Sequence, residues 1–288
     1  METKELLKKV RKIEFKTRKL TNEIFAGKYH SAFKGRGMTF SEVREYTVDD
    51  DVRMIDWKVT ARFNHPYVKI FEEERELTVI LMIDVSGSQF FGSKELKREY
   101  IAEIAGVLAF SAIENNDKIG VIFFSDKVEK FIPPAKGRRH TLRIIREILS
   151  FNPDSQGTNI KEALKYLINA IKKKSIVFLI SDFFDSNYES SLNIAARKHD
   201  LITIKVNDPR EREIPKMGLV SMYDAESGQY IRVDTNRKKV RDRLQQWFEN
   251  HDQTVKNTFY RFGIDFIHLC TGDDYVKAFI QLFKRRMV

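Results

Sequence analysis

Three side chains that carry oxygen atoms, Asp84, Ser86 and Ser88, occupy alternate positions directly after an apolar run. In a turn, this spacing places the three side-chain oxygens on one side of the chain. Hard divalent cations prefer oxygen ligands, and Mg²⁺ requires a near-octahedral shell of them. Three oxygens do not complete such a shell, so a metal site at this turn needs donors from other parts of the chain.

Two further polar segments supply candidate donors. Ser181 and Asp182 end a second apolar run, and Thr158 lies in the short segment Gly157-Thr158-Asn159 before an expected helix. Ligands of open α/β sheets bind beyond the carboxyl ends of the strands. We therefore expect the hydroxyl of Thr158 and the carboxylate of Asp182 to join the turn at residues 84–88.

The elements that must position these side chains follow a regular order from residue 77 onward. Short apolar strands alternate with amphipathic helices, a pattern typical of a mostly parallel sheet with helices on both faces. The sequence predicts a doubly wound α/β fold with an edge strand at 127–134, which two prolines close, and a small β-hairpin at 218–233. The other expected strands are 77–84, 118–124, 175–182, 200–206 and 265–270, and the expected helices are 94–115, 138–149, 160–173, 190–198, 239–262 and 274–286.

The first 76 residues follow a different pattern. A basic helix is expected over residues 4–25, residues 29–66 are expected to be irregular, and residues 67–76 are expected to form an extended strand that runs on toward 77–84. We predict that residues 1–76 form an amino-terminal segment packed on a main domain at residues 77–288.

Within this segment, arginines alternate with aspartates and aromatic residues. Arginine forks match carboxylates in a bidentate way, so we expect arginine–aspartate pairs with Tyr46 and Trp57 packed over them. Two interpretations stay open: a structural clasp on the main domain, or a docking surface for a partner. The residues concerned are Arg44, Tyr46, Asp50, Asp51, Arg53, Asp56, Trp57 and Arg62.

The order D-x-S-x-S, then G-T-N, then a strand-terminal S-D resembles the metal-ion-dependent adhesion site of the von Willebrand factor A domain. The matching positions are Asp84, Ser86, Ser88, Thr158 and Asp182. The resemblance implies that Ser86 and Ser88 bind the cation directly and Thr158 binds it directly or through water. It implies that Asp84 and Asp182 act mostly through water. Mg²⁺ is the expected cation, with Mn²⁺ and Ca²⁺ as alternatives, and a partner carboxylate fills the open coordination position.

A second resemblance precedes this domain. The segments Gly35–Tyr46, Asp50–Trp57, Thr60-Ala61-Arg62 and Phe71–Glu76 resemble the signature of the DUF58 family. Members of that family are associated with MoxR-type AAA+ ATPases in chaperone-like assembly. The resemblance implies a non-enzymatic adaptor whose metal site binds an acidic residue of such an ATPase, of another von Willebrand factor A protein, or of both.

Charge supports an alternative class of function. The chain has 288 residues and a formal net charge of +10, with +7 in its first 40 residues and −4 in residues 41–76. A basic protein of this kind is a candidate binder of nucleic acid or of an anionic surface. A metal-dependent hydrolase is the weaker third hypothesis, because Ser86 stands where a phosphatase of the D-x-D type has its second acid and no Walker A loop is present.

The composition also indicates the cellular compartment in which the protein works. Cys270 is the only cysteine, which excludes a disulfide within the chain and a multi-cysteine zinc site. The apolar runs are of strand length, whereas a transmembrane helix needs about 20 predominantly apolar residues. We therefore expect a cytoplasmic protein without a membrane-spanning segment.

Overall fold

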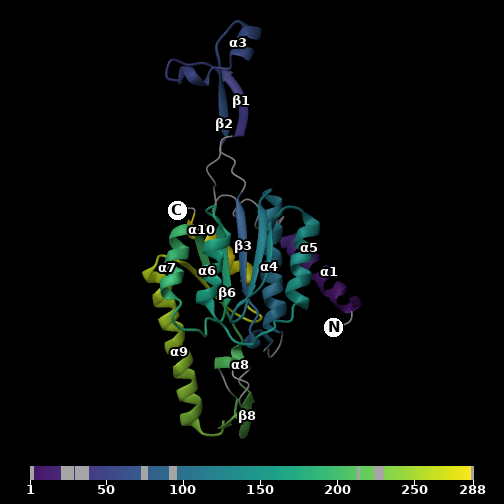
Figure 1. The fold of residues 1–288 in the computed structure, drawn as a ribbon, viewed down its shortest axis with the longest axis vertical. Coiled ribbons are helices and arrows are strands. Elements are labelled where there is room, and N and C mark those ends of the chain that lie inside the picture. Colours follow the sequence, from purple (N-terminus) through teal and green to yellow (C-terminus); the bar gives the residue numbers. More distant parts are fainter. Residues whose placement is uncertain are drawn as a thin grey trace.

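A six-stranded sheet forms the centre of the molecule (Figure 1). The computed structural model describes residues 3–20, 29, 39–72, 77–90, 96–212, 215–223 and 230–286. The strand order is β10-β7-β6-β3-β4-β5, and only β5 runs antiparallel to its neighbour. The strands are β3 (Thr78–Asp84), β4 (Lys118–Phe124), β5 (Val128–Ala135), β6 (Ile176–Ser181), β7 (Asp200–Asn207) and β10 (Asp265–Cys270). The predicted mostly parallel α/β fold, with residues 127–134 at its edge, is confirmed.

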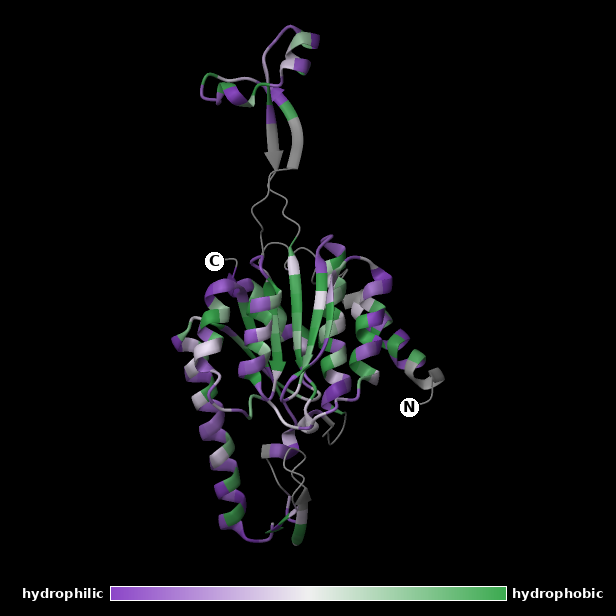
Figure 2. Ribbon diagram, in the orientation of Figure 1, coloured by the Kyte–Doolittle hydropathy of each residue, from purple (hydrophilic) through white to green (hydrophobic). Residues whose placement is uncertain are grey.

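Helices cover both faces of this sheet, and Figure 2 shows the apolar strands enclosed between them. Alternate residues of β3 serve two separate cores: Val79 and Leu81 pack toward one face, and Ile80 and Met82 pack toward the other. The first face carries α1 (Thr3–Leu20), α4 (Lys97–Glu114), α5 (Arg138–Ser150) and α10 (Tyr275–Arg286). The second carries α6 (Ile160–Ala170), α7 (Glu189–Lys198) and α9 (Lys238–Arg261).

Helix α4 is buried on nearly all sides, because α1 and α5 pack against it. At Gly106 the approach of α1 is close: a Cβ atom there would lie 3.0 Å from Cγ2 of Ile13. Two ion pairs join lysines of α1 to glutamates of α4, Lys9 to Glu99 and Lys16 to Glu103. Part of the positive charge of the amino-terminal helix is therefore paired within the chain.

Residues 39–72 depart from the sequence prediction. The span expected to be irregular contains β1 (Thr39–Glu45), the 3₁₀ turn η2 (Val52–Met54) and α3 (Trp57–Phe63). The side chains of Asp51 and Asp56 accept backbone N–H groups at the starts of η2 and α3, which explains how such short elements form. Strand β2 (Tyr67–Glu72) pairs antiparallel with β1 and not with the main sheet. The expected continuation through residues 73–76 lies outside the described residues.

Two ends of the molecule are distinguished in Figure 1. The unit of β1, β2 and α3 lies at the end where β3 begins, and the helix α8 (Pro209–Arg212) lies at the end where the parallel strands finish. The predicted hairpin is confirmed as β8 (Leu219–Tyr223) and β9 (Tyr230–Asp234), which also lie at the α8 end. Residues 224–229, which connect the two strands, lie outside the described residues. The predicted domain boundary at residue 76 stays a prediction.

None of the helices in the described part of the chain has the length and apolar character required to cross a bilayer. This finding agrees with the strand-sized apolar runs of the sequence.

His199, which follows α7, is a buried histidine whose protonation can be used to test the packing around α7. The side chain is buried, and neither ring nitrogen has a hydrogen-bond partner among the described residues. Burial, together with the nearby Lys198, lowers the pKa of His199 to about 4. Because this value lies below the ordinary histidine pKa of about 6.5, the unfolded chain binds the proton first as the pH falls. The contribution of the neutral, buried His199 to the free energy of unfolding is therefore fully present above about pH 6.5. It is lost as the pH drops toward 4.

We expect the melting temperature of the wild-type chain to fall between pH 7 and pH 5, and this fall to be smaller in His199→Leu. Thermal denaturation followed by circular dichroism at several pH values measures both. Parallel curves for the two proteins would contradict the account of His199.

Candidate functional site

The turn that follows β3 gathers the first three predicted site residues. One carboxylate oxygen of Asp84 accepts the backbone N–H of Ser86 at 2.9 Å, and the hydroxyl oxygens of Ser86 and Ser88 lie 3.1 Å apart. The turn continues into the short 3₁₀ helix η3 (Gly87–Phe90). The side chains of Asp84 and Ser86 are buried, whereas that of Ser88 is half-buried. The turn therefore presents neighbouring oxygens at the carboxyl end of the sheet.

The register of the sheet brings Ser181 and Asp182 to this turn. Strand β6 lies beside β3 with Ile180 level with Ile83, so the next residues, Ser181 and Asp84, face each other. The hydroxyl of Ser181 donates to the second carboxylate oxygen of Asp84 at 2.6 Å. The carboxylate of Asp182 accepts a hydrogen bond from Ser88. Adjacent parallel strands thus place both acids at one edge, as the sequence predicts.

The loop that carries Thr158 lies against the same turn. The backbone N–H of Gly87 donates to the carbonyl of Gln156 at 2.9 Å, two residues before Thr158. On the other side, the N–H of Asn159 donates to the carbonyl of Ser125 at 2.8 Å. The Asn159 side chain then caps α6 by accepting the N–H of Glu162. The loop is held by backbone bonds on both sides of Thr158, whose role as a ligand stays a prediction.

The two buried carboxylates of the site repel each other. Burial, and then the negative charge of Asp182, raise the pKa of Asp84 to about 7. Burial also opposes ionisation of Asp182, but the ammonium of Lys97 and the hydrogen bond from Ser88 outweigh it and lower the pKa of Asp182. An added cation would relieve the cost of ionising Asp84, because an opposite charge favours the charged form of an acid.

Lys97 is the site residue that the sequence prediction missed. It stands at the first turn of α4 with a fully buried side chain, and its Nζ lies 3.0 Å from Oδ2 of Asp182 and 2.5 Å from Oε1 of Glu211. Burial lowers the pKa of Lys97, but the two carboxylates outweigh this effect and raise it above its ordinary value. Lysine at the start of a helix is usually solvent-exposed, so no signal in the sequence marked this one as buried.

The donor set suits a hard divalent cation. Adjacent ligands of an octahedral Mg²⁺ ion are about 2.9 Å apart, given Mg–O distances of about 2.0–2.1 Å, and the hydroxyls of Ser86 and Ser88 are 3.1 Å apart. The Oε1 atom of the neighbouring Gln89 is buried and has no hydrogen-bond partner among the described residues. No group of three or more His, Cys, Asp or Glu side chains that could hold a metal ion is present in the described part of the chain, and two of the five candidate ligands here, Asp84 and Asp182, are carboxylates.

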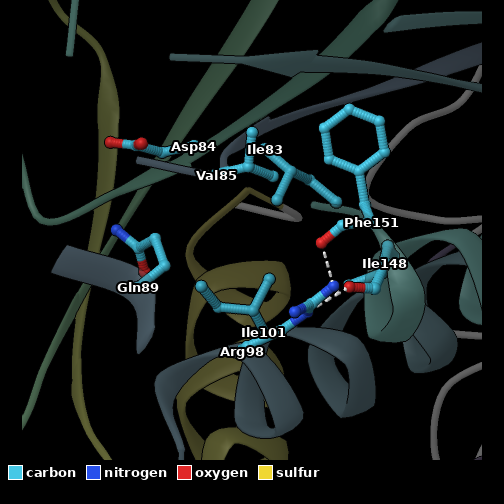
Figure 3. A pocket seen from close by; sticks show the side chains of 8 residues that line it. All are labelled: Ile83, Asp84, Val85, Gln89, Arg98, Ile101, Ile148 and Phe151. Atoms are coloured by element: carbon cyan, nitrogen blue, oxygen red, sulfur yellow. Dashed lines mark hydrogen bonds between the residues drawn. The ribbon is translucent and has the colours of Figure 1, made fainter. Parts of the chain in front are cut away.

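A small pocket lies behind the turn and is shown in Figure 3. Asp84 and Gln89 line its polar side, whereas Ile148 and Phe151 belong to its apolar side. The guanidinium of Arg98 donates to the backbone carbonyls of Ile148 and Phe151, which fixes the end of α5 beside the start of α4. The pocket therefore lies between the turn and the packed ends of α4 and α5.

The predicted docking residues do not join this site. They lie in the unit of β1, β2 and α3, at the opposite end of the sheet (Figure 1). Arg44 and Asp50 form the expected bidentate pair at 2.7 and 2.5 Å, and this hydrogen bonding lowers the pKa of Asp50.

The other expected pairs differ. The guanidinium of Arg53 lies 3.9 Å from the carboxylate of Asp51, and the carboxylate of Asp56 lies 3.7 Å from the ammonium of Lys69. Trp57 is 67% exposed, so the expectation that it packs over an ion pair is wrong. The indole is exposed, and none of the residues of α3 is buried. Tyr46 and Arg62 also belong to this unit, and a docking role for any of these residues stays a prediction.

Comparison with known proteins supplies the family. The family model described as "Protein of unknown function DUF58" matches residues 42–254. Uncharacterized proteins of Mycobacterium bovis and Mycobacterium tuberculosis are 27% identical to this chain over 281 residues, which is 96% of this chain and 88% of each relative.

Similar solved structures were also found. One is described as an aerotolerance-related membrane protein from Bacteroides fragilis, with 15% identity and a TM-score of 0.49. Another is described as the conserved hypothetical protein BatB from Bacteroides thetaiotaomicron, with 17% identity and a TM-score of 0.47. Each match covers 73% of this chain and 98% of the solved chain.

Proposed function

Because this chain belongs to the DUF58 family, and because its strand ends gather hydroxyl and carboxylate oxygens, we propose that it is a non-enzymatic, metal-dependent adaptor. In this proposal a Mg²⁺ ion binds at Asp84, Ser86, Ser88, Thr158 and Asp182, and a carboxylate of a partner protein completes its coordination. The observation that carries the proposal is the pair of hydroxyls of Ser86 and Ser88, 3.1 Å apart beside two buried acids.

The contacts of the two acids explain why an external carboxylate is favoured. Both oxygens of Asp84 accept hydrogen bonds from the chain, from Ser86 and Ser181. Asp182 is engaged by Ser88 and Lys97. The neutral hydroxyls are therefore the natural direct ligands, and a cation bound mainly by neutral groups keeps a strong attraction for an outside anion. The metal supplies this attraction, and the chain supplies position and orientation.

The proposed partner is an acidic residue of a MoxR-type AAA+ ATPase, of another von Willebrand factor A protein, or of both, in chaperone-like assembly in the cytoplasm. The basic side chains Arg237, Lys238, Lys239 and Arg243 are exposed at the start of α9, which lies at the same end of the molecule as the site. Basic groups near the site would speed encounter with an acidic surface. The proposal assigns no covalent chemistry to the chain.

Calorimetric titration with MgCl₂ tests the metal part of this proposal. We expect one weak site per chain, because water or a partner must fill part of the coordination shell. Ser86→Ala should lower the affinity without unfolding the chain, since it removes one hydroxyl and keeps the backbone N–H that Asp84 accepts. Absence of Mg²⁺-dependent heat with the wild-type chain would count against the proposal.

A further inference from the structure

A buried ion-pair network joins the candidate metal site to α8. The ammonium of Lys97 lies between the carboxylates of Asp182 and Glu211, and the side chain of Lys97 is 0% exposed. The other carboxylate oxygen of Glu211 accepts the side-chain amide of Asn207 at 2.9 Å and the backbone N–H of Asp208 at 3.1 Å. Glu211 is thereby fixed at the end of β7, and it holds Lys97 in place.

The charges of this network do not balance. Asp84, Asp182 and Glu211 are three acids, and among the described residues Lys97 is the basic side chain that forms ion pairs with two of them, Asp182 and Glu211. When all are ionised, the group carries a net charge of −2, which one divalent cation would neutralise. Burying uncompensated charge is costly, so the uncompensated negative charge favours binding of a cation. The lysine already supplies part of the positive charge and contacts one of the predicted metal ligands.

We propose that Lys97 is an internal cation that shares Asp182 with the metal, and that Lys97 and Glu211 together set how tightly the site holds its divalent cation. This inference rests on the proposed function and identifies two residues that tune it. The Asp182 oxygen that accepts the hydrogen bond of the Lys97 ammonium is less able to bind a metal directly. The site therefore keeps its metal weakly held and open to a partner carboxylate.

Opposite substitutions separate this role from a merely structural one. Lys97→Met removes the competing charge and should tighten Mg²⁺ binding by about tenfold or more, because two charges a few ångströms apart interact strongly inside a protein. Glu211→Gln lowers the negative charge of the group and frees Lys97 for Asp182, so it should weaken Mg²⁺ binding by about three- to tenfold. A structural role alone would make both variants bind more weakly.

Removal of Lys97 alone leaves two buried carboxylates without their partner, which destabilises the fold. The double variant Lys97→Met/Glu211→Gln removes one positive and one negative charge together, so it should fold like the wild type. It should also bind Mg²⁺ more tightly than the wild type, since Asp182 is then free for the metal.

The experiment is a calorimetric Mg²⁺ titration of the full chain in all four forms, with circular dichroism to confirm folding. Tighter binding by the double variant and weaker binding by Glu211→Gln support the inference. Affinities within twofold of the wild type in every folded variant would overturn the inference and leave the proposed function intact. If the wild type binds no Mg²⁺ but the Lys97 variants do, the inference holds and the proposed function fails. Absence of binding in all four forms would overturn both.

Discussion

The Asp84→Ala variant is expected to lose the stabilisation by Mg²⁺ that the proposed function predicts for the wild-type chain. At a Mg²⁺ concentration of about ten times the Kd, binding to the folded state alone adds about 1.4 kcal/mol to the free energy of unfolding. For a chain of this size that corresponds to a rise of about 2–3 °C in the melting temperature. The substitution removes a charge of the site and the acceptor of the Ser86 N–H and Ser181 hydroxyl, so the Mg²⁺-dependent rise should disappear.

Asp154→Ala is the matched control for Asp84. Asp154 is 81% exposed, belongs to the same loop region as Thr158 and contacts Lys127 at 3.4 Å. This substitution removes an equal charge from the same end of the sheet but leaves the turn at residues 84–88 unchanged. The Mg²⁺-dependent rise in melting temperature should therefore persist. Thermal melts with and without MgCl₂ measure both variants. A rise of wild-type size in Asp84→Ala would show that the cation binds elsewhere.

The Phe259→Ala variant is expected to lose about 3–5 kcal/mol of stability. Phe259 is fully buried, and its ring contacts those of Phe183 at 5.1 Å and Phe266 at 5.2 Å between centroids. Val255 and Phe259 are the buried side chains that α9 contributes among the described residues. The substitution therefore leaves a large cavity and removes the main anchor of α9 on the second core.

The same substitution should also affect the candidate metal site. Phe183 directly follows Asp182 and has a positive φ of 59°, an uncommon conformation for a bulky residue that the surrounding packing must hold. Loss of the Phe259 ring should loosen this residue and weaken Mg²⁺ binding as well as the fold. Urea unfolding and Mg²⁺ titration measure the two effects. Tyr260→Ala, at a 64% exposed neighbouring position, should cost less than about 1 kcal/mol. Similar losses in both variants would contradict the assigned role of Phe259.

Much of the main domain could be predicted from the sequence because its strands are continuous apolar runs. Runs such as 176–180 have no polar residue to place in solvent, so they predict strands that are buried on both faces of the sheet. The carboxyl ends of parallel strands meet at one edge of the sheet, so the sequence alone predicts that Asp84 and Asp182 lie together. The DUF58 resemblance, which the family match confirms, rested on the segment before this domain.

The parts that were missed depend on contacts between distant residues. Lys97 has no local feature that marks it as buried, and its partners Asp182 and Glu211 follow much later in the chain. The unit at residues 39–72 was missed because its elements are short and their stability comes from pairing and capping. The aspartates before Val52 and Trp57 were a usable signal, since Asp is a favoured residue at helix starts.

Capture of a MoxR-type ATPase by the immobilised full chain, in MgCl₂ and in EDTA, tests the central claim most directly. The account predicts that the wild-type chain retains the ATPase in MgCl₂ and releases it in EDTA, and that Asp84→Ala retains it in neither buffer. Equal capture by the wild type in both buffers, or by Asp84→Ala in MgCl₂, would contradict recognition through the metal. Failure of the wild type to capture the ATPase in MgCl₂ would contradict the proposed partner.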